Sequence, residues 1–242
     1  MRPLKEAYFS VVIDACFLSL RRGSYKKEPV YIALGTDHEG RREILGFWVM
    51  GSEGESALTW REIFYELKER GAERIGIVVS DDLAGIEEAT RAAFPGADHQ
   101  LCCVHAMRNS QRKVRRKDWE EVSQDLKAIY RAPSQKEAEL SLFSFAERWK
   151  KHYPGLVRYW RENFPHLVAF MKYPEQVRPY IYTTNQLERI NKEVKRRTKT
   201  IEVFSSEESL ISVLYLILKN ENERLGQRRL RGFAKSRLEE EG

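Results

Sequence analysis

The first third of the chain alternates short apolar runs with polar segments. Residues 9–20, 30–37 and 42–50 are each short and rich in β-branched or aromatic side chains. The segments between them, 21–29 and 37–41, carry the glycine, proline and charged residues that are typical of turns. We therefore predict three sequential strands joined by short loops, which form a meander.

The period of the pattern then changes. Apolar residues at near-helical spacing predict a helix over residues 56–71, with Gly71 placed to end it. A buried strand over 74–82, a short helix over 84–94 and another strand over 98–105 follow. Strands that first meander and then alternate with helices indicate an α/β fold, with a mixed sheet covered by helices.

From His105 onward the pattern predicts only helices. A basic segment over 105–117 precedes helical patterns over 118–130 and 134–153. Proline then interrupts the chain four times, at Pro154, Pro165, Pro174 and Pro179. Further on, Ser205 and Glu208 form a capping box ahead of an apolar helix.

We divide the chain accordingly. Residues 106–180 are interpreted as a helical insertion, with enough aromatic side chains for a small core of its own. Residues 1–105 and 181–242 are the two parts of the α/β core that the insertion separates.

Composition indicates a soluble globular protein. The chain has 242 residues, of which 42% are hydrophobic and 11% aromatic, so it can bury a substantial core. Its three cysteines, Cys16, Cys102 and Cys103, suggest a reducing compartment rather than a disulfide framework. No signal peptide is evident at the start, and the longest apolar run, 210–218, is about half of a membrane span. We predict a cytoplasmic protein without a membrane partner.

Charge is distributed unevenly along the chain. Residues 1–100 carry 13 basic and 17 acidic side chains, whereas residues 101–242 carry 29 basic and 19 acidic ones. This favours a polyanionic partner for the second part, although a solvated charged surface would give the same balance. The run from residue 108 to 117 has no acidic residue, so its cations are candidates for binding phosphate: Arg108, Arg112, Lys113, Arg115, Arg116 and Lys117.

Two aspartates stand out against their surroundings. Asp14 lies within an apolar run, where a charge is costly unless it is paired or binds a metal ion. Asp81 ends a buried strand, and open α/β sheets bind their ligands at the carboxyl ends of strands. The alternatives are a solvent-facing strand edge for Asp14 and a helix N-cap for Asp81, a role for which Asp82 is a rival.

Glu188 is a third candidate, near the start of a strongly basic helix. Helical spacing puts it on one face with Asn191, Lys192 and Lys195, so a carboxylate is aligned with cations that could hold a phosphate backbone. The alternatives are a solvated glutamate or a salt bridge to Lys192, four residues on. Carboxylates from three separate elements are the ligands that two-metal phosphoryl chemistry needs, with two Mg²⁺ ions about 4 Å apart.

The chain resembles a known family at this point. The order of elements resembles the ribonuclease H-like fold, and the motifs resemble DDE transposases of bacterial insertion sequences in the Mutator-like superfamily. The resemblance extends from about residue 9 to 234 and rests on four motifs: VVIDACFLSLR, GIVVSDDLAGIEEA, QLCCVHAMRN and TTNQLERINKEVKRRTK.

The resemblance implies a mixed five-stranded sheet with flanking helices and an all-α insertion before the last catalytic helix. It implies that Asp14, Asp81 and Glu188 are catalytic ligands of two Mg²⁺ ions, for which Mn²⁺ can substitute. Cys102 and His105 match the family's Cys-x-x-His motif, which helps to position DNA. The full set of DNA-binding candidates is Cys102, His105, Arg108, Arg112, Arg115, Arg116, Asn185, Asn191, Lys192, Lys195 and Arg196.

The activity it implies is cleavage at the 3′ ends of a mobile element, followed by attack of the freed 3′-hydroxyls on target DNA. We expect a homodimer on DNA and association with the nucleoid. The alternatives are a metal-dependent nuclease that cuts without joining and a catalytically inactive DNA-binding relic, although the presence of all three carboxylates argues against the relic. Family members usually carry a DNA-binding region before the first catalytic strand, which here begins close to Met1. We therefore expect a fragment, a truncated relic, or a protein that works with a separate DNA-binding subunit.

Two further groups of residues have alternative interpretations. Cys102 and His105, with His99 and Cys103, could bind zinc, but a strand would send adjacent cysteines to opposite faces. Cys103 would then be a small core residue. The aromatic residues Trp149, Tyr159 and Trp160 could stack on an unpaired base, although we favour a place in the core of the insertion.

Overall fold

The computed structural model describes residues 2–22, 24–50 and 56–233, which contain a mixed five-stranded sheet. The strand order is β3-β2-β1-β4-β5, in which β1 and β2, like β2 and β3, are antiparallel, whereas β4 is parallel to both β1 and β5. The predicted α/β class with a mixed five-stranded sheet is confirmed. The strands are β1 (Ala7–Arg22), β2 (Ser24–Thr36), β3 (Arg42–Val49), β4 (Arg74–Ser80) and β5 (Asp98–Leu101).

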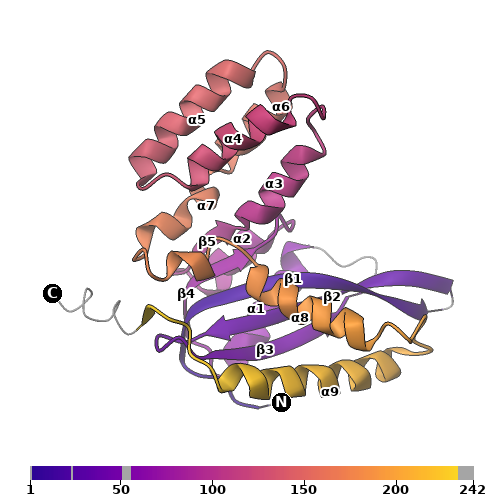
Figure 1. Cartoon of the computed structure of the whole chain (residues 1–242). Helices are drawn as coiled ribbons and strands as arrows, with labels where there is room; N and C mark the ends of the chain where they lie inside the picture. Colours follow the sequence, from indigo (N-terminus) through magenta and orange to yellow (C-terminus); the bar gives the residue numbers. More distant parts are fainter. Residues whose placement is uncertain (1, 23, 51–55, 234–242) are drawn as a thin grey trace.

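Helices cover both faces of this sheet (Figure 1). On one face lie α1 (Ala57–Glu69) and α2 (Ile86–Ala93), and on the other lie α8 (Asn185–Arg197) and α9 (Glu207–Gly226). The remaining helices form a lobe that rises above the sheet in Figure 1. They are α3 (Cys103–Gln111), α4 (Trp119–Tyr130), α5 (Gln135–Trp149), α6 (Pro154–Glu162), α7 (Phe164–Leu167), and the 3₁₀ helices η1 (Ala169–Lys172) and η2 (Arg178–Tyr180).

The central strand β1 is buried on both faces. Val11 and Ile13 pack with α1 and α2, whereas Val12 and Cys16 pack with the helices of the opposite face. Asp14 falls on the same side as Val12 and Cys16, because side chains alternate along a strand. It therefore lies beneath α8, which contacts β1. The alternative of a solvent-facing strand edge is wrong.

Serine residues cap two of the helices that cover the sheet. The Ser56 hydroxyl accepts a hydrogen bond from the Thr59 N–H at the start of α1, and Ser206 accepts one from the Ser209 N–H at the start of α9. Each bond satisfies a backbone donor that has no partner within its helix. Our prediction that Ser205 caps the last helix is thus wrong by one residue, since two adjacent serines offer the same chemistry.

The insertion does not have a hydrophobic core of its own. Its buried side chains, such as Leu126, Phe145 and Trp160, belong to one continuous cluster with Val12 and Leu18 of β1. The prediction of a separate core is wrong, because composition shows how apolar a segment is but not what it packs against. The two lobes share one core on this face of the sheet, which holds the insertion in place.

Two predicted boundaries are also wrong. Residues 21, 22 and 24–29 belong to strands rather than to a turn, because β1 and β2 remain paired out to Arg22 and Ser24. An exposed strand has the same polar composition as a loop, which explains the error. The last predicted strand ends at Leu101, and α3 begins at Cys103. Residues 234–242, which we assigned to the second part of the core, lie outside the described residues.

A helix that crosses a bilayer must be long and predominantly apolar. Across residues 2–22, 24–50 and 56–233, no helix combines that length with that apolar character.

Candidate active site

Asp14 is a nearly buried carboxylate, with 6% of its surface exposed. The Asn191 amide donates to Asp14 Oδ2 at 3.0 Å, and the Ala15 N–H donates to Oδ1 at 2.9 Å. Burial, with the nearby negative charge of Asp81, raises the pKa of Asp14 to about 7. The side chain is therefore held in place but is short of positive charge.

Asp81 directly follows β4 and meets α3. The Asp81 carboxylate forms an ion pair with Nδ1 of His105, which lies in the first turn of that helix. Burial disfavours the imidazolium, but hydrogen bonds to Asp81 and Cys102 outweigh it and raise the pKa of His105 to about 10. Helix α2 begins after Gly85 without a side-chain cap. The alternative that Asp81 or Asp82 caps the helix is therefore wrong.

Glu188 lies in the first turn of α8. Arg108 of α3 donates to it through both terminal nitrogens, from Nη1 to Oε1 at 2.6 Å and from Nη2 to Oε2 at 3.4 Å. Burial opposes ionisation of Glu188, but the Arg108 guanidinium lowers the pKa of this carboxyl overall. The ion-pair partner is thus a residue 80 positions away rather than the neighbouring Lys192 of our alternative.

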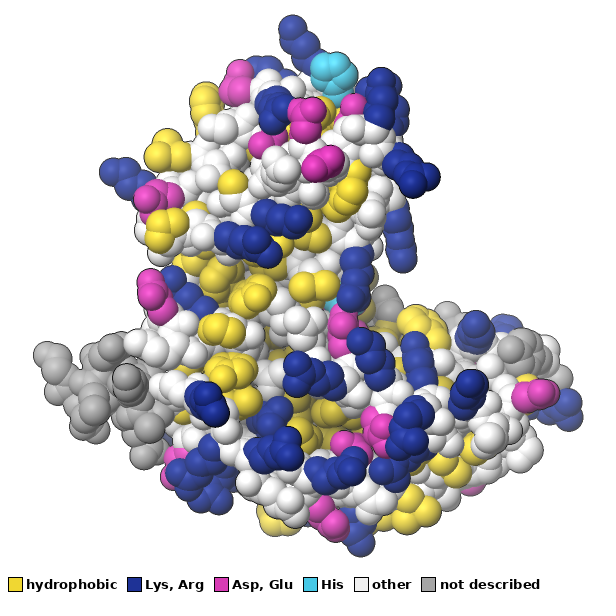
Figure 2. Space-filling model, viewed as in Figure 1, with side chains coloured by type: hydrophobic (Ala, Val, Ile, Leu, Met, Phe, Trp, Pro, Cys, Tyr) yellow, Lys and Arg dark blue, Asp and Glu magenta, His cyan; other side chains and the backbone are white. Residues whose placement is uncertain are grey.

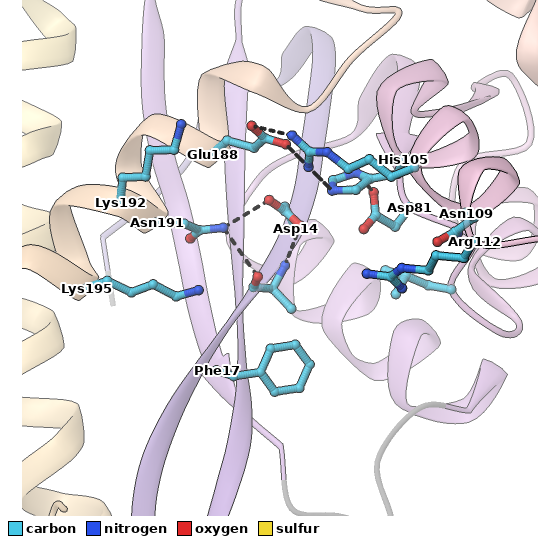
Figure 3. Close-up of a pocket in the computed structure, with 13 residues that line it drawn as sticks. Asp14, Phe17, Asp81, His105, Asn109, Arg112, Glu188, Asn191, Lys192 and Lys195 are labelled. Carbon is cyan, nitrogen blue, oxygen red and sulfur yellow. Dashed lines mark hydrogen bonds and ion pairs between the residues drawn. The ribbon is translucent and has the colours of Figure 1, made fainter. Parts of the chain in front are cut away.

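These three carboxylates line one pocket of about 600 Å³ at the junction of the two lobes. Lys192 and Lys195 reach it from α8 on one side, and Asn109 and Arg112 reach it from α3 on the other (Figure 3). Lys and Arg side chains also gather on the surface around this junction (Figure 2). Asp14, Asp81 and Glu188 are the acidic residues of the lining, and its basic residues are His105, Arg108, Arg112, Lys192 and Lys195.

Other predicted DNA-binding residues lie outside this lining. Cys102 is buried, and its sulfur accepts hydrogen bonds from the N–H and hydroxyl of Thr184. Arg115 pairs with Asp118 at 2.9 Å. Three more are exposed elsewhere on the surface, with Arg196 ion-paired to Glu193: Arg116, Asn185 and Arg196.

The two tryptophans lie in the core, as we favoured. Trp160 has no exposed surface, and its indole N–H donates to the Ser110 hydroxyl at 2.9 Å. Trp149 is 8% exposed and donates to Asp125 at 2.7 Å. Neither ring presents a free face on which a base could stack in this structure.

Sequence reasoning missed four residues of the pocket, of which two are the aliphatic Ala15 and Leu83. Asn109 follows Arg108 on the pocket side of α3, and Phe17 lies at the pocket with 53% of its surface exposed. The sequence carries no signal for Phe17, because most of β1 is buried on both faces and alternation alone does not mark an exposed position in such a strand.

The pocket fits a divalent cation with oxygen ligands. Carboxylate oxygens are the ligands that Mg²⁺ prefers. Burial, and after it the negative charge of Asp81, raises the pKa of Asp14, and a bound cation would favour its ionised form. Among the described residues, Asn191 Oδ1 is buried without a hydrogen-bond partner. The oxygen atoms of the three carboxylates do not all lie within 4.8 Å of one another, whereas the ligand atoms of Asp81, Cys102 and His105 do.

The four residues that we considered as zinc ligands, Cys102, His105, His99 and Cys103, do not form one cluster in the structure. Cys103 is the first residue of α3, so our argument from strand alternation is wrong, but its sulfur donates to the Leu167 carbonyl at 3.5 Å. His99 bonds to Ser80 instead. The ligand atoms of Cys102 and His105 gather with Asp81 instead, and Cys103 is a fully buried core residue.

Comparisons with known proteins agree with these observations. Residues 1–227 match the family described as Transposase, Mutator family. The transposase for insertion sequence element ISRM3 of Rhizobium meliloti (strain 1021) is 39% identical over 221 residues, which cover 90% of this chain and 55% of the relative. The transposase for insertion sequence element IS905 of Lactococcus lactis subsp. lactis (strain IL1403) is 34% identical over 232 residues, which cover 96% of this chain and 59% of that relative.

The chain thus spans about half the length of the curated relatives it matches. The solved catalytic domain of Mos1 mariner transposase is 12% identical and covers 62% of this chain and 83% of that one, with a TM-score of 0.28, which is too low to bear on the argument. The family match covers nearly all of the chain and confirms the resemblance that the four motifs suggested. This chain belongs to the Mutator family of transposases.

Proposed function

We propose that this chain cleaves the 3′ ends of a mobile DNA element and joins them to target DNA. The observation that carries the proposal is the convergence of Asp14, Asp81 and Glu188, from three separate elements, on one pocket. All other charged side chains of that lining are basic, which suits a polyanionic substrate. The similar insertion-sequence transposases support the same activity.

The three carboxylates would hold two Mg²⁺ ions, for which Mn²⁺ can substitute. When bound, such ions activate a water molecule or a 3′-hydroxyl and stabilise the leaving oxygen. The protein prepares the ligands through their neighbours. Asn191 orients Asp14 by donating to its Oδ2, and His105 orients Asp81 through their ion pair.

The cations of the pocket would hold the DNA backbone beside these ligands. Lys192 and Lys195 are exposed on α8, and Arg112 extends from α3 on the opposite side (Figure 3). Phosphate contacts from two sides fix the register and orientation of a strand without reading its sequence. A strand that crosses the pocket would thus present its phosphate to the carboxylates.

Three further expectations belong to this proposal. The division into core segments 1–105 and 181–242 with an insertion over 106–180 stays a prediction. So do the DNA partners, namely element ends and target, and a cytoplasmic, nucleoid-associated location. A nuclease that cuts without joining and an inactive DNA-binding relic are the alternatives, and the products of one assay distinguish them.

The test is nicking and joining of plasmid DNA by the native chain with Mg²⁺ or Mn²⁺, compared with Asp81→Asn. Removal of a metal ligand forfeits several kcal/mol of transition-state stabilisation, so we expect cleavage to fall about 10³-fold. Asp82→Asn is the matched control, because Asp82 is the next residue and does not line the pocket.

The outcomes separate the candidate functions. Joined products that need Asp81 but not Asp82 would support the transposase proposal. Nicks without joined products would favour the nuclease. DNA binding without cleavage by the native chain, or equal cleavage by both variants, would contradict a catalytic role for the site.

A further inference from the structure

Three metal-binding side chains meet at a second place, where the insertion contacts the core. Glu87 belongs to α2, His99 to β5 and His166 to α7, and α7 packs against β5 (Figure 1). A ligand atom of each residue lies within 4.8 Å of those of the other two. The three side chains line a pocket of about 190 Å³, separate from the candidate active site.

His99 presents a buried nitrogen that lacks a partner. Only 9% of the residue is exposed, and its Nε2 lies 2.9 Å from Ser80 Oγ. The single hydroxyl proton of Ser80 is donated to the Asp81 carbonyl at 2.8 Å, so Ser80 Oγ accepts from the Nε2–H of His99. Among the described residues, His99 Nδ1 has no hydrogen-bond partner.

This arrangement leaves His99 ready to bind a cation. Burial, together with the neighbouring His166, lowers the pKa of His99 to about 4, so the ring is neutral at pH 7 and Nδ1 carries a free lone pair. A hydrogen bond at one ring nitrogen, which fixes the tautomer for a ligand at the other, is typical of metal-binding histidines.

The other two side chains already have a suitable spacing. His166 Nε2 lies 3.2 Å from Glu87 Oε2. Tetrahedral zinc, with bonds of about 2.0–2.1 Å, places neighbouring ligand atoms about 3.3 Å apart. A simple ion pair would also explain the contact between Glu87 and His166. It would not explain the adjacent His99 ring, 5.3 Å away between centroids, with its unpartnered nitrogen.

We propose that Glu87, His99 and His166 bind a divalent transition-metal ion, for which Zn²⁺ is the best match. Two imidazoles and one carboxylate are typical zinc ligands, whereas Mg²⁺ takes oxygen ligands. A water molecule would complete the coordination, since the Glu87 side chain is 42% exposed. Asp98 lines the same pocket, but its carboxylate already accepts hydrogen bonds from Lys172 at 2.5 Å and from Tyr173 at 3.0 Å, so we do not count it among the ligands.

The bound ion would clamp the insertion onto the core. It would join α2 and β5 to α7 at the contact where Gln100 already bonds to the backbone of Leu167 and Phe170. His99, which precedes Gln100, is hydrogen-bonded to Ser80, and Ser80 precedes Asp81 in the chain. The site therefore fixes the position of the insertion over the active-site pocket and takes no part in the chemistry.

The test is calorimetric binding of Zn²⁺ to the whole chain in excess Mg²⁺, together with thermal unfolding. We expect one Zn²⁺ ion to bind per chain at a site that requires His166. With zinc about 100-fold above its Kd, the Tm should rise by about 5–10 °C. His166→Ala should remove both effects, and Glu87→Gln should weaken binding about tenfold or more. His152→Ala, which changes an exposed histidine elsewhere in the insertion, should keep both effects.

Cobalt identifies which cluster is occupied, because Asp81, Cys102 and His105 also gather ligand atoms within 4.8 Å. A thiolate ligand gives Co²⁺ an intense near-ultraviolet charge-transfer band that imidazole and carboxylate ligands lack. We expect weak visible bands that disappear in His166→Ala and persist in Cys102→Ser. Zinc binding that survives His166→Ala, depends on Cys102 alone, or is absent at micromolar zinc would overturn the proposal.

Discussion

At the residue scale, the candidate active site is a set of charges that are mostly balanced in pairs. Asp81 pairs with His105, and Glu188 pairs with Arg108. Within the part of the chain that the structure describes, the hydrogen-bond donors to Asp14 are the neutral amides of Asn191 and of its backbone neighbour Ala15. The sequence predicted all three carboxylates because each is anomalous in its local surroundings. It did not predict the two ion pairs, because their members are brought together by the tertiary fold.

The unbalanced charge of Asp14 predicts that Asp14→Asn raises the free energy of unfolding at high pH. Its pKa of about 7 lies above the ordinary value of 3.8, so between about pH 4 and 7 the folded chain binds more protons than the unfolded chain. Stability therefore falls as the pH rises through this window. One pKa unit corresponds to about 1.4 kcal/mol, so the maximum penalty is about 4 kcal/mol.

The measurement is the Tm of both proteins at pH 5 and pH 8, with divalent metal removed by a chelator. The asparagine loses part of the hydrogen bonding, so we expect Asp14→Asn to be more stable by about 2 kcal/mol at pH 8. That is a Tm about 4–8 °C higher. The difference should shrink at pH 5. A variant that is less stable than the native chain at pH 8 would contradict the assigned charge state.

At the element scale, α8 has a buried face and a face that lines the pocket. Leu187, Ile190 and Val194 are buried against the core, whereas Lys192 and Lys195 line the pocket with Glu188. This division was predictable, because helical periodicity relates residues only three or four positions apart. The start of α3 was not, since the pattern around Cys102 and Cys103 fits a strand or a helix equally well.

The basic face of α8 predicts a salt-dependent defect in DNA binding. Lys192→Ala and Lys195→Ala should each weaken affinity for any DNA sequence and reduce the slope of log K against log salt by about 1. Lys150→Ala is the control, because Lys150 ends α5 and is paired with Glu147 at 2.7 Å. Binding measured by fluorescence anisotropy at several salt concentrations decides the matter. Unchanged slopes in both α8 variants would exclude direct phosphate contacts.

At the scale of the whole molecule, two lobes share one core and enclose the pocket between them. Arg108 and Glu188, 80 residues apart, meet because the insertion leaves the core after β5 and returns at α8. The sequence predicted a mixed five-stranded sheet with flanking helices but not the order of its strands. The common core was not predictable, because it depends on contacts between residues as distant as Val12 and Phe145.

The whole molecule also sets an expectation for assembly. Cutting and joining two element ends in one event requires two active sites, and each chain provides one such pocket. We expect a dimer when the chain binds DNA that carries element ends, and analytical ultracentrifugation of the complex measures this. A complex with one chain that cleaves and joins at the full rate would contradict the expectation.

The most direct measurement of the central claim compares two glutamates of one helix. Glu188 lines the pocket, whereas Glu193 pairs with Arg196 and Arg197 outside it. DNA cleavage with Mg²⁺ should fall about 10³-fold in Glu188→Gln and stay near the native rate in Glu193→Gln. Both variants should keep near-native DNA affinity. If Glu188→Gln cleaves as well as Glu193→Gln, Glu188 is not a metal ligand and the three-carboxylate site is wrong.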